Sequence, residues 1–80
     1  MSDPLHPLEY ARRVTEMSVD DLWLRYFALG GMSSALEIEA YLFRALIPAP
    51  HDHDVLAVAL NERFAELGGD HPVPYADDSQ

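Results

Sequence analysis

Apolar side chains recur along this chain at the spacing of amphipathic α-helices. Four such stretches are present, over about residues 7–17, 19–29, 34–47 and 52–67. The second has the i, i+3, i+4, i+7, i+8 pattern of a single apolar face, formed by Val19, Leu22, Trp23, Tyr26 and Phe27. Short connections between the stretches favour helices that pack as neighbours. The pattern therefore predicts an all-α fold, a compact bundle of four short helices.

The first stretch has two faces of opposite character. Its apolar face comprises Tyr10, Ala11, Val14 and Met17, and its polar face comprises Glu9, Arg12, Arg13 and Glu16. Pro7 suits the first turn, since a proline there loses no hydrogen bond within the helix. A helix of this kind is expected to bury the apolar face.

The second and third helices have recognisable start signals. Ser18 with Asp21 approximates a capping box, in which the serine hydroxyl accepts a hydrogen bond from a backbone N–H three residues on. Ser34 with Glu37 forms a complete box, because a glutamate side chain is long enough to reach back to the capping residue. Both serines are therefore assigned to capping rather than to chemistry.

Glycine and proline mark the helix ends. Glycine adopts the left-handed conformation of a helix C-cap without steric cost, so residues 30–31 and 68–69 are expected to end the second and fourth helices. Pro48 ends the third, because proline cannot continue the hydrogen bonding of a helix. Beyond it, Asp52 or His53 is the expected cap of the fourth helix.

The third helix is unusually apolar around its circumference. One strip on it comprises Leu36, Ala40, Phe43 and Ile47. A second comprises Ala35, Ile38, Leu42, Ala45 and Leu46. A helix that is apolar on so many sides is normally packed on two of them. We therefore expect the third helix to lie at the centre of the bundle.

Composition limits the organisation and the setting of the chain. Eighty residues suffice for one small helical domain, over residues 1–69, followed by an acidic, flexible tail over residues 70–80. The absence of cysteine excludes disulfides and suggests the cytoplasm, and no apolar run approaches the roughly 20 residues that span a membrane. Arginine without lysine, together with frequent alanine, suggests a GC-rich bacterial gene.

The charge balance opposes the function that the helix spacing first suggests. Residues 18–47 have the outline of a helix-turn-helix, a motif that places its second helix in the DNA major groove. The formal net charge is −9, and the second helix of the unit carries Glu37 and Glu39 against a single Arg44. Acidic surfaces repel phosphate backbones. A DNA-binding protein is therefore an alternative that the spacing supports and the charges oppose, and no nucleic-acid partner is expected.

Residues 51–54, His-Asp-His-Asp, are the one local cluster of metal-ligand side chains. His51 and His53 are two residues apart at a helix start, so their side chains diverge. A site would need a further ligand from a terminus, such as His6 or His71. A metal-binding module that uses His51 and His53 is the second alternative, although the aspartates are explained as first-turn anions and no cofactor is expected.

Two charges fall within apolar faces on a helical wheel. Glu39 lies within the apolar arc of the third helix, and Arg63 lies near the centre of the apolar face of the fourth. One interpretation is a buried ion pair between them, which would be tolerated only if each satisfied the other. The alternative is that each side chain extends to water along its own stem.

The remaining function class is a protein that acts by binding another protein. No catalytic motif such as Gly-x-Ser-x-Gly or His-Glu-x-x-His is present, so we do not expect an enzyme. The residues expected to be exposed and available to a partner lie off the main apolar stripes: Leu24, Ala28, Tyr41 and Val58. An acidic chain suits a partner with a basic surface, and a second copy of the chain is the other candidate. The leading expectation is a small acidic regulatory or adaptor module, or a homodimer.

Overall fold

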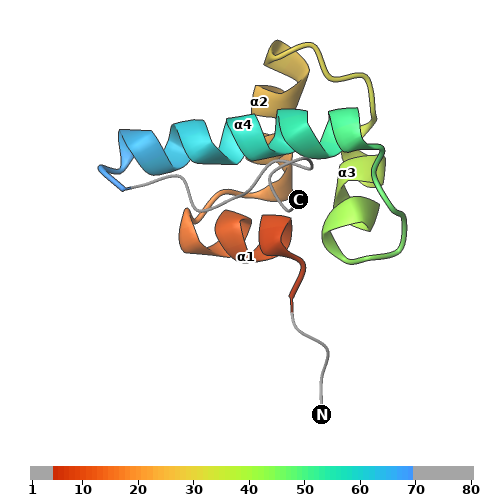
Figure 1. Ribbon diagram of the computed structural model, residues 1–80, viewed down its shortest axis with the longest axis horizontal. Coiled ribbons are helices and arrows are strands. Elements are labelled where there is room, and N and C mark those ends of the chain that lie inside the picture. The colour runs from red at the N-terminus through yellow and green to blue at the C-terminus, as the bar shows by residue number, and fades with distance from the viewer. Residues whose placement is uncertain (1–4, 70–80) are drawn as a thin grey trace.

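Four α-helices make up the part of the chain that the computed structural model describes, residues 5–69 (Figure 1). They are α1 (Pro7–Val14), α2 (Val19–Ala28), α3 (Ala35–Leu42) and α4 (Pro50–Glu66). The predicted all-α fold is confirmed, and the structure places no strand in this range. The predicted acidic tail over residues 70–80 lies outside the described residues. Within residues 5–69, no helix combines the length and apolar character needed to cross a bilayer.

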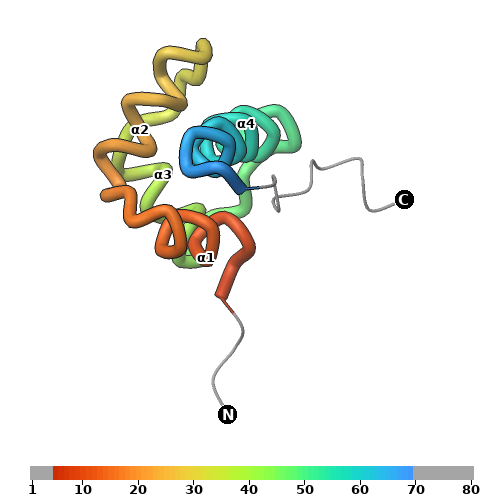
Figure 2. The backbone as a smooth tube through the Cα atoms, turned by 90° about the vertical axis from the view of Figure 1, so that its left-hand side faces the viewer, coloured from red at the N-terminus to blue at the C-terminus, as the bar shows by residue number. Residues whose placement is uncertain are grey.

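The longest helix, α4, holds the central position. It packs against α1 and against α2, and α2 also packs against α3. Figure 2, which looks along α4, shows the other three helices arranged around one side of it. The prediction that the third helix is central is therefore wrong. With α2 as its main neighbour, α3 needs only one buried face.

All four helices contribute to a single hydrophobic core. The hydrophobic side chains with less than a tenth of their surface exposed are Leu8, Ala11, Met17, Leu22, Tyr26, Ile38, Tyr41, Leu42, Leu56, Ala57, Ala59 and Leu60. Val19, Trp23, Val55 and Phe64 pack against this cluster and are partly buried. The predicted stripe of α2 supplies Leu22 and Tyr26 to this core, with Val19 and Trp23 packed against it, whereas Phe27 of the same stripe is 59% exposed.

Helices α2 and α4 end within one residue of their predicted ends, and α1 and α3 end several residues early. Gly30 (φ 95°) and Gly68 (φ 82°) follow α2 and α4 in the left-handed conformation that glycine favours. The same turn follows α1 at Glu16 (φ 59°) and α3 at Arg44 (φ 63°), without glycine. The predicted ends at 17 and 47 were wrong because these two turns lack that signal.

The start of α4 also differs from its prediction. The helix begins at Pro50, and its capping position is Ala49, which makes no side-chain hydrogen bond to the helix. Neither Asp52 nor His53 is the cap, because the preceding prolines already direct the chain into the helix two residues earlier. By contrast, Ser18 accepts from the backbone N–H of Asp21, and the complete capping box of Ser34 and Glu37 is confirmed.

Helix α1 buries a carboxylate that was assigned to its polar face. Glu9 is fully buried and accepts hydrogen bonds from Arg12 at 2.6 and 2.7 Å and from Arg13 at 2.8 Å. Burial raises the pKa of Glu9, but the hydrogen bonds and positive charges of the two arginines outweigh it and hold that pKa below 4.5. Tyr10 and Val14, expected in the core, are instead about half exposed. The helix is thus rotated relative to its polarity-based prediction.

The hydroxyl of Tyr26 joins three segments of the fold. It donates to Asp52 Oδ1 on α4 at 2.9 Å. It accepts from the backbone N–H groups of Met32 at 3.1 Å and Ser33 at 2.8 Å, in the loop between α2 and α3. The ring lies directly against Gly31, where an added Cβ would come within 2.2 Å of it. Asp52 therefore serves as an acceptor for Tyr26 rather than as a helix cap.

We predict that Tyr26→Phe lowers the free energy of unfolding by about 2 kcal/mol, because two backbone donors and one carboxylate lose a partner. For a domain of this size, that loss lowers Tm by roughly 8–16 °C. Tyr10→Phe removes an exposed hydroxyl and is the matched control, with a change of less than about 0.5 kcal/mol. Thermal unfolding followed by circular dichroism measures both. Equal Tm values for the two variants would contradict the role given to the Tyr26 hydroxyl.

We further predict that Glu9 makes stability fall in acid. A carboxyl whose pKa is lowered by folding stabilises the fold above its unfolded pKa, near 4.5, and loses that contribution as pH falls through the folded value. Glu9→Gln should therefore be less stable than the native chain at pH 7, by about 1–3 kcal/mol. This difference in the free energy of unfolding between Glu9→Gln and the native chain should become smaller below pH 4.5. Urea unfolding at pH 7 and pH 3 measures it, with Glu62→Gln, an exposed carboxyl on α4, as the control. A gap that is independent of pH would rule out the charge of Glu9 as its source.

Candidate functional site

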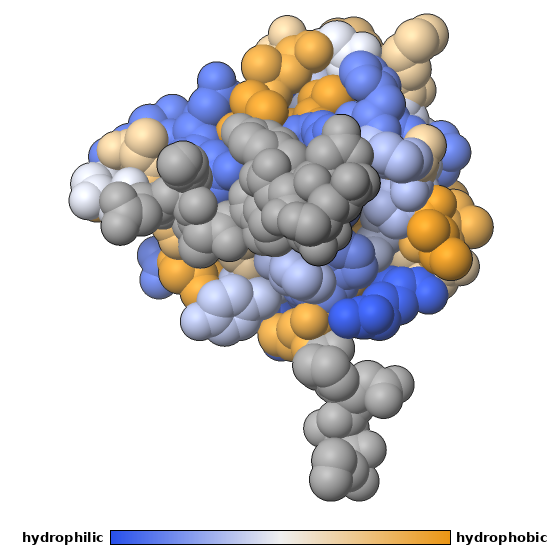
Figure 3. Space-filling view, viewed as in Figure 1, coloured by the Kyte–Doolittle hydropathy of each residue, from blue (hydrophilic) through white to orange (hydrophobic). Residues whose placement is uncertain are grey.

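Large apolar side chains remain exposed on α3 and on the loops at its two ends. We call this surface the α3 face and define it by Met32, Leu36, Phe43, Leu46 and Ile47. Met32 and Ile47 are each 94% exposed and Leu36 is 75% exposed. In Figure 3, hydrophobic surface lies at the right-hand edge, where Figure 1 places α3 and its flanking loops. Exposure of several large aliphatic residues within one such segment is characteristic of contact surfaces.

Three residues of the α3 face, Leu36, Phe43 and Ile47, belong to one of the two strips that the sequence assigned to packing, and Leu46 belongs to the other. Ile38, Tyr41 and Leu42 point to the interior and are buried. Leu36 and Phe43 are seven residues apart, two helical turns, and therefore share the opposite side of α3. Because α3 packs mainly on α2, this side has no helix to cover it within residues 5–69.

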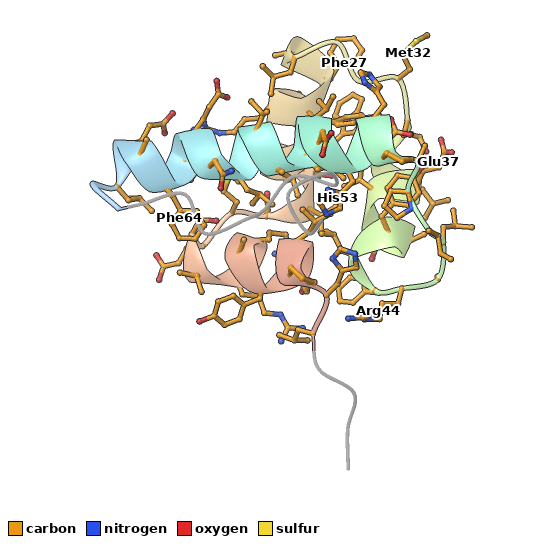
Figure 4. The ribbon with its side chains drawn as sticks, in the orientation of Figure 1. Phe27, Met32, Glu37, Arg44, His53 and Phe64 are labelled. Carbon is orange, nitrogen blue, oxygen red and sulfur yellow. The ribbon has the colours of Figure 1, made fainter. Side chains whose placement is uncertain are left out.

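The loop before α3 is held by three aromatic side chains. In addition to the two bonds that Tyr26 accepts, Trp23 Nε1 donates to the backbone oxygen of Ser33 at 3.0 Å. The Tyr41 hydroxyl is 3.2 Å from Ser33 Oγ. The backbone that carries Met32 is thus fixed, while its side chain extends into solvent (Figure 4).

The turn after α3 sets the other end of the face. The backbone N–H of Ala45 donates to Ala40 O at 2.8 Å, the bond that closes a left-handed helix end. Arg44 occupies the left-handed position of that turn. The turn stops α3 and directs Leu46 and Ile47 along the surface rather than into the core.

Charged side chains border the α3 face. Glu37 and Glu39 are exposed on α3, and Arg44 is exposed at its C-terminal end. The other four arginines are paired: Arg12 and Arg13 with Glu9, and Arg25 and Arg63 with Glu66. Arg44 is the one arginine with no carboxylate oxygen within 4 Å among residues 5–69.

A hollow of about 360 Å³ lies beside Arg44, between the α3 face and the start of α1. His6, Leu46, Ile47 and Pro48 line it with Arg44. Nδ1 of His6 accepts from the backbone N–H of Leu8 at 3.1 Å and so caps α1. Partial burial, followed by the positive charge of Arg44 and the neighbouring imidazole of His53, lowers the pKa of His6. The His6 ring is therefore largely neutral at pH 7.

The histidines do not assemble as the metal-binding alternative requires. His53 faces His6, with ring centroids 6.2 Å apart, whereas His51 is exposed to solvent. Nδ1 of His53 is 3.6 Å from Asp54 Oδ1, too far for a hydrogen bond. Between residues 5 and 69, histidine and carboxylate side chains form no group of three that could hold a metal ion. His71 lies outside the described residues.

The four residues predicted to meet a partner have different surroundings. Leu24 is 57% exposed and lies at a hollow of about 400 Å³, and Ala28 is also exposed. Val58 is partly buried. The expected exposure of Tyr41 is wrong, because its side of α3 packs into the core. A binding role for Leu24, Ala28 and Val58 stays a prediction.

The proposed pair of Glu39 and Arg63 is not formed. Arg63 is 3.3 Å from Glu66 on its own helix, and Glu39 is exposed on α3. Glu66 also receives two hydrogen bonds from Arg25, at 2.8 and 2.9 Å. These bonds, together with Arg63, lower the pKa of Glu66 to about 2. The pairing failed because α3 packs mainly on α2, so Glu39 and Arg63 never face each other.

None of the five residues of the α3 face was assigned to a partner surface from the sequence, because four of them were expected in packed strips and Met32 was given no role. A methionine between two glycines and two serines carries no periodicity, so only the burial pattern of the folded chain shows it. The arrangement as a whole, an apolar centre with a charged border, has the chemistry of a contact surface. Comparisons with models of known families, with curated proteins and with solved structures found no match to this chain.

We predict that Leu36 can be truncated without loss of stability. Leu36→Ala should change the free energy of unfolding by less than about 0.5 kcal/mol, because the side chain is already in water. Leu42→Ala, on the buried side of the same helix, should cost about 2–5 kcal/mol. Denaturant unfolding of the two variants measures the difference. A large loss for Leu36→Ala would mean that α3 is packed on both sides, as the sequence pattern suggested.

Proposed function

We propose that this chain is a non-enzymatic protein-binding module and that the α3 face is its contact surface. The observation that carries the proposal is the exposure of Met32, Leu36 and Ile47 at the two ends and along one side of a single helix. Leaving that much apolar surface in water is unfavourable by about 25 cal/mol for each Å². Covering it with a partner recovers this free energy.

The fixed geometry of the face supports the same conclusion. Its first loop is held by Trp23, Tyr26 and Tyr41, and its second begins with the closed turn at Arg44. A surface that must be complementary to a partner has to be held in one shape. We propose that the module acts in the cytoplasm of a bacterium, as its composition suggests, and that its partner is another protein or a second copy.

The two alternatives receive less support. In a helix-turn-helix, α3 would face DNA, yet its exposed side presents Leu36, Glu39 and Phe43 rather than basic groups. Arg12 and Arg13, the neighbouring arginines of α1, share the buried carboxylate of Glu9 and so offer DNA little uncompensated positive charge. A metal module would have to be built on His6 and His53, which contribute two ligands from the described part of the chain.

The test compares two double variants of the tagged full chain in affinity purification from its own cells. Leu36→Ser with Ile47→Ser removes two members of the α3 face. Tyr10→Ser with Leu67→Ser changes two side chains of comparable type, each more than half exposed, elsewhere on the surface. All four positions are exposed, so both double variants should keep the native Tm within a few degrees.

We expect at least one protein that the native chain and the control retain about tenfold more than the α3 variant does. The identified protein is then purified, and its affinity for each form of the chain is measured by calorimetry. Self-association measured with the purified chain counts as the same outcome. If neither another protein nor the chain itself depends on Leu36 and Ile47, the proposed function is wrong.

A further inference from the structure

We propose that the α3 face binds the α3 face of a second copy of this chain. The two α3 helices lie antiparallel about a twofold axis, with Arg44 of each copy beside Glu37 and Glu39 of the other. This inference rests on the proposed function and specifies its partner. Apolar spacing, charge placement and the conformation of Arg44 support it separately.

The apolar residues of α3 have the spacing of a seam between two helices. Leu36, Ala40 and Phe43 are separated by four and then three residues, the repeat that keeps one side of a helix against a neighbour. Ala40 lies between two large side chains, so the helices approach most closely there. In an antiparallel pair centred on Ala40, Leu36 of one copy meets Phe43 of the other. Large side chains thus pack on both sides of a narrow centre.

The charges at the border of the face select the antiparallel direction. Figure 4 shows Glu37 and Arg44 at opposite ends of α3. In a twofold antiparallel pair, the C-terminal end of each α3 lies against the N-terminal end of the other. Both Arg44 side chains therefore gain carboxylate neighbours. A parallel pair would place the two Arg44 side chains together and the glutamates together, which is repulsive. The arginine that has no partner among residues 5–69 is therefore paired in the dimer.

The backbone at Arg44 is unfavourable for any residue with a Cβ atom. A left-handed conformation costs roughly 1–2 kcal/mol for an ordinary L-residue, and glycine avoids that cost. Glycine occupies the corresponding position after α2 and α4, and Glu16 occupies it after α1. Strained backbone positions cluster at functional sites, and here the guanidinium completes the border of the seam.

The net charge of −9 acts against association, but mostly from a distance. The border of the α3 face carries two carboxylates and one guanidinium, so the local charge imbalance is small. Repulsion between the remaining charges is screened at separations beyond about 8 Å at physiological ionic strength. We therefore expect the dimer to tighten as salt is raised from about 10 to 150 mM, the opposite of an interface held mainly by ion pairs.

Sedimentation equilibrium of the full chain at pH 7, over about 10 μM to 1 mM protein, measures the association. We expect the average mass to rise with concentration from one chain towards two. Each substitution enters a twofold interface twice, so Leu36→Ser should weaken the dimer at least about tenfold. Tyr10→Ser, on α1, should leave the dissociation constant within about twofold of the native value.

Two charge variants test the antiparallel arrangement. Arg44→Glu replaces the guanidinium at each end of the seam with a carboxylate. Glu39→Arg replaces one carboxylate at each end with a second guanidinium. Arg44→Glu alone should dimerise at least about tenfold more weakly than the native chain, because only acidic groups then meet at each end of the seam. An equimolar mixture should recover mixed dimers, which native mass spectrometry identifies by mass. Mixed dimers that make up no more than half of all dimers, the share that random pairing gives, would overturn the antiparallel arrangement.

Arg44→Gly separates association from folding. It relieves the left-handed backbone, so the monomer should become slightly more stable while the dimer weakens. Glu16→Gly relieves the equivalent turn after α1 and should stabilise the chain without changing association. If the native chain stays monomeric to 1 mM, the inference is overturned, whereas the proposed function then depends on another protein that requires Leu36 and Ile47.

Discussion

The hydroxyl of Tyr26 is the contact on which the positions of α2, α3 and α4 depend. A phenol can donate one hydrogen bond and accept two, and here all three are made. The donated bond ties α2 to α4 through Asp52, and the two accepted bonds hold the loop that leads into α3. The ring excludes any side chain at Gly31, so the loop closes tightly against it. Helix α3, whose main neighbour is α2, takes its place on the fold largely through this loop.

The sequence predicted the helices well and two of their ends poorly, for one physical reason. A helix end is visible in a sequence when the left-handed residue after it is glycine, as at Gly30 and Gly68. At Glu16 and Arg44 the same backbone turn is formed by residues that usually avoid it, and tertiary packing decides the conformation. The charge of Glu9 led to a wrong prediction as well, because Glu9 was assigned to the exposed polar face and is buried. A helical wheel shows polarity, but it cannot show that two arginines satisfy a carboxylate well enough to bury it.

The sequence predicted part of the candidate site. The strip of Leu36, Ala40, Phe43 and Ile47 was recognised, yet its exposure was not, because periodicity shows which residues share a side of a helix and not how many neighbours the helix has. The number of neighbours depends on where α4 lies, which the pattern of α3 alone does not contain. Tyr41 was predicted to be exposed for the same reason. It lies instead on the one side of α3 that is buried. Because α3 is peripheral, it has one buried side and one exposed apolar side.

The anchoring of the loop at Met32 and Ser33 has a consequence for the kinetics of any encounter. Disordered segments that fold on binding lose conformational entropy at that moment, which weakens the complex. Here the loop backbone loses that entropy when the chain folds, since the three aromatic anchors all belong to α2 and α3. Association through this surface can then proceed as the docking of two rigid bodies, with only the side chains of Met32 and Ile47 left to settle. Differences in affinity between variants of the face should accordingly arise mainly in dissociation rates.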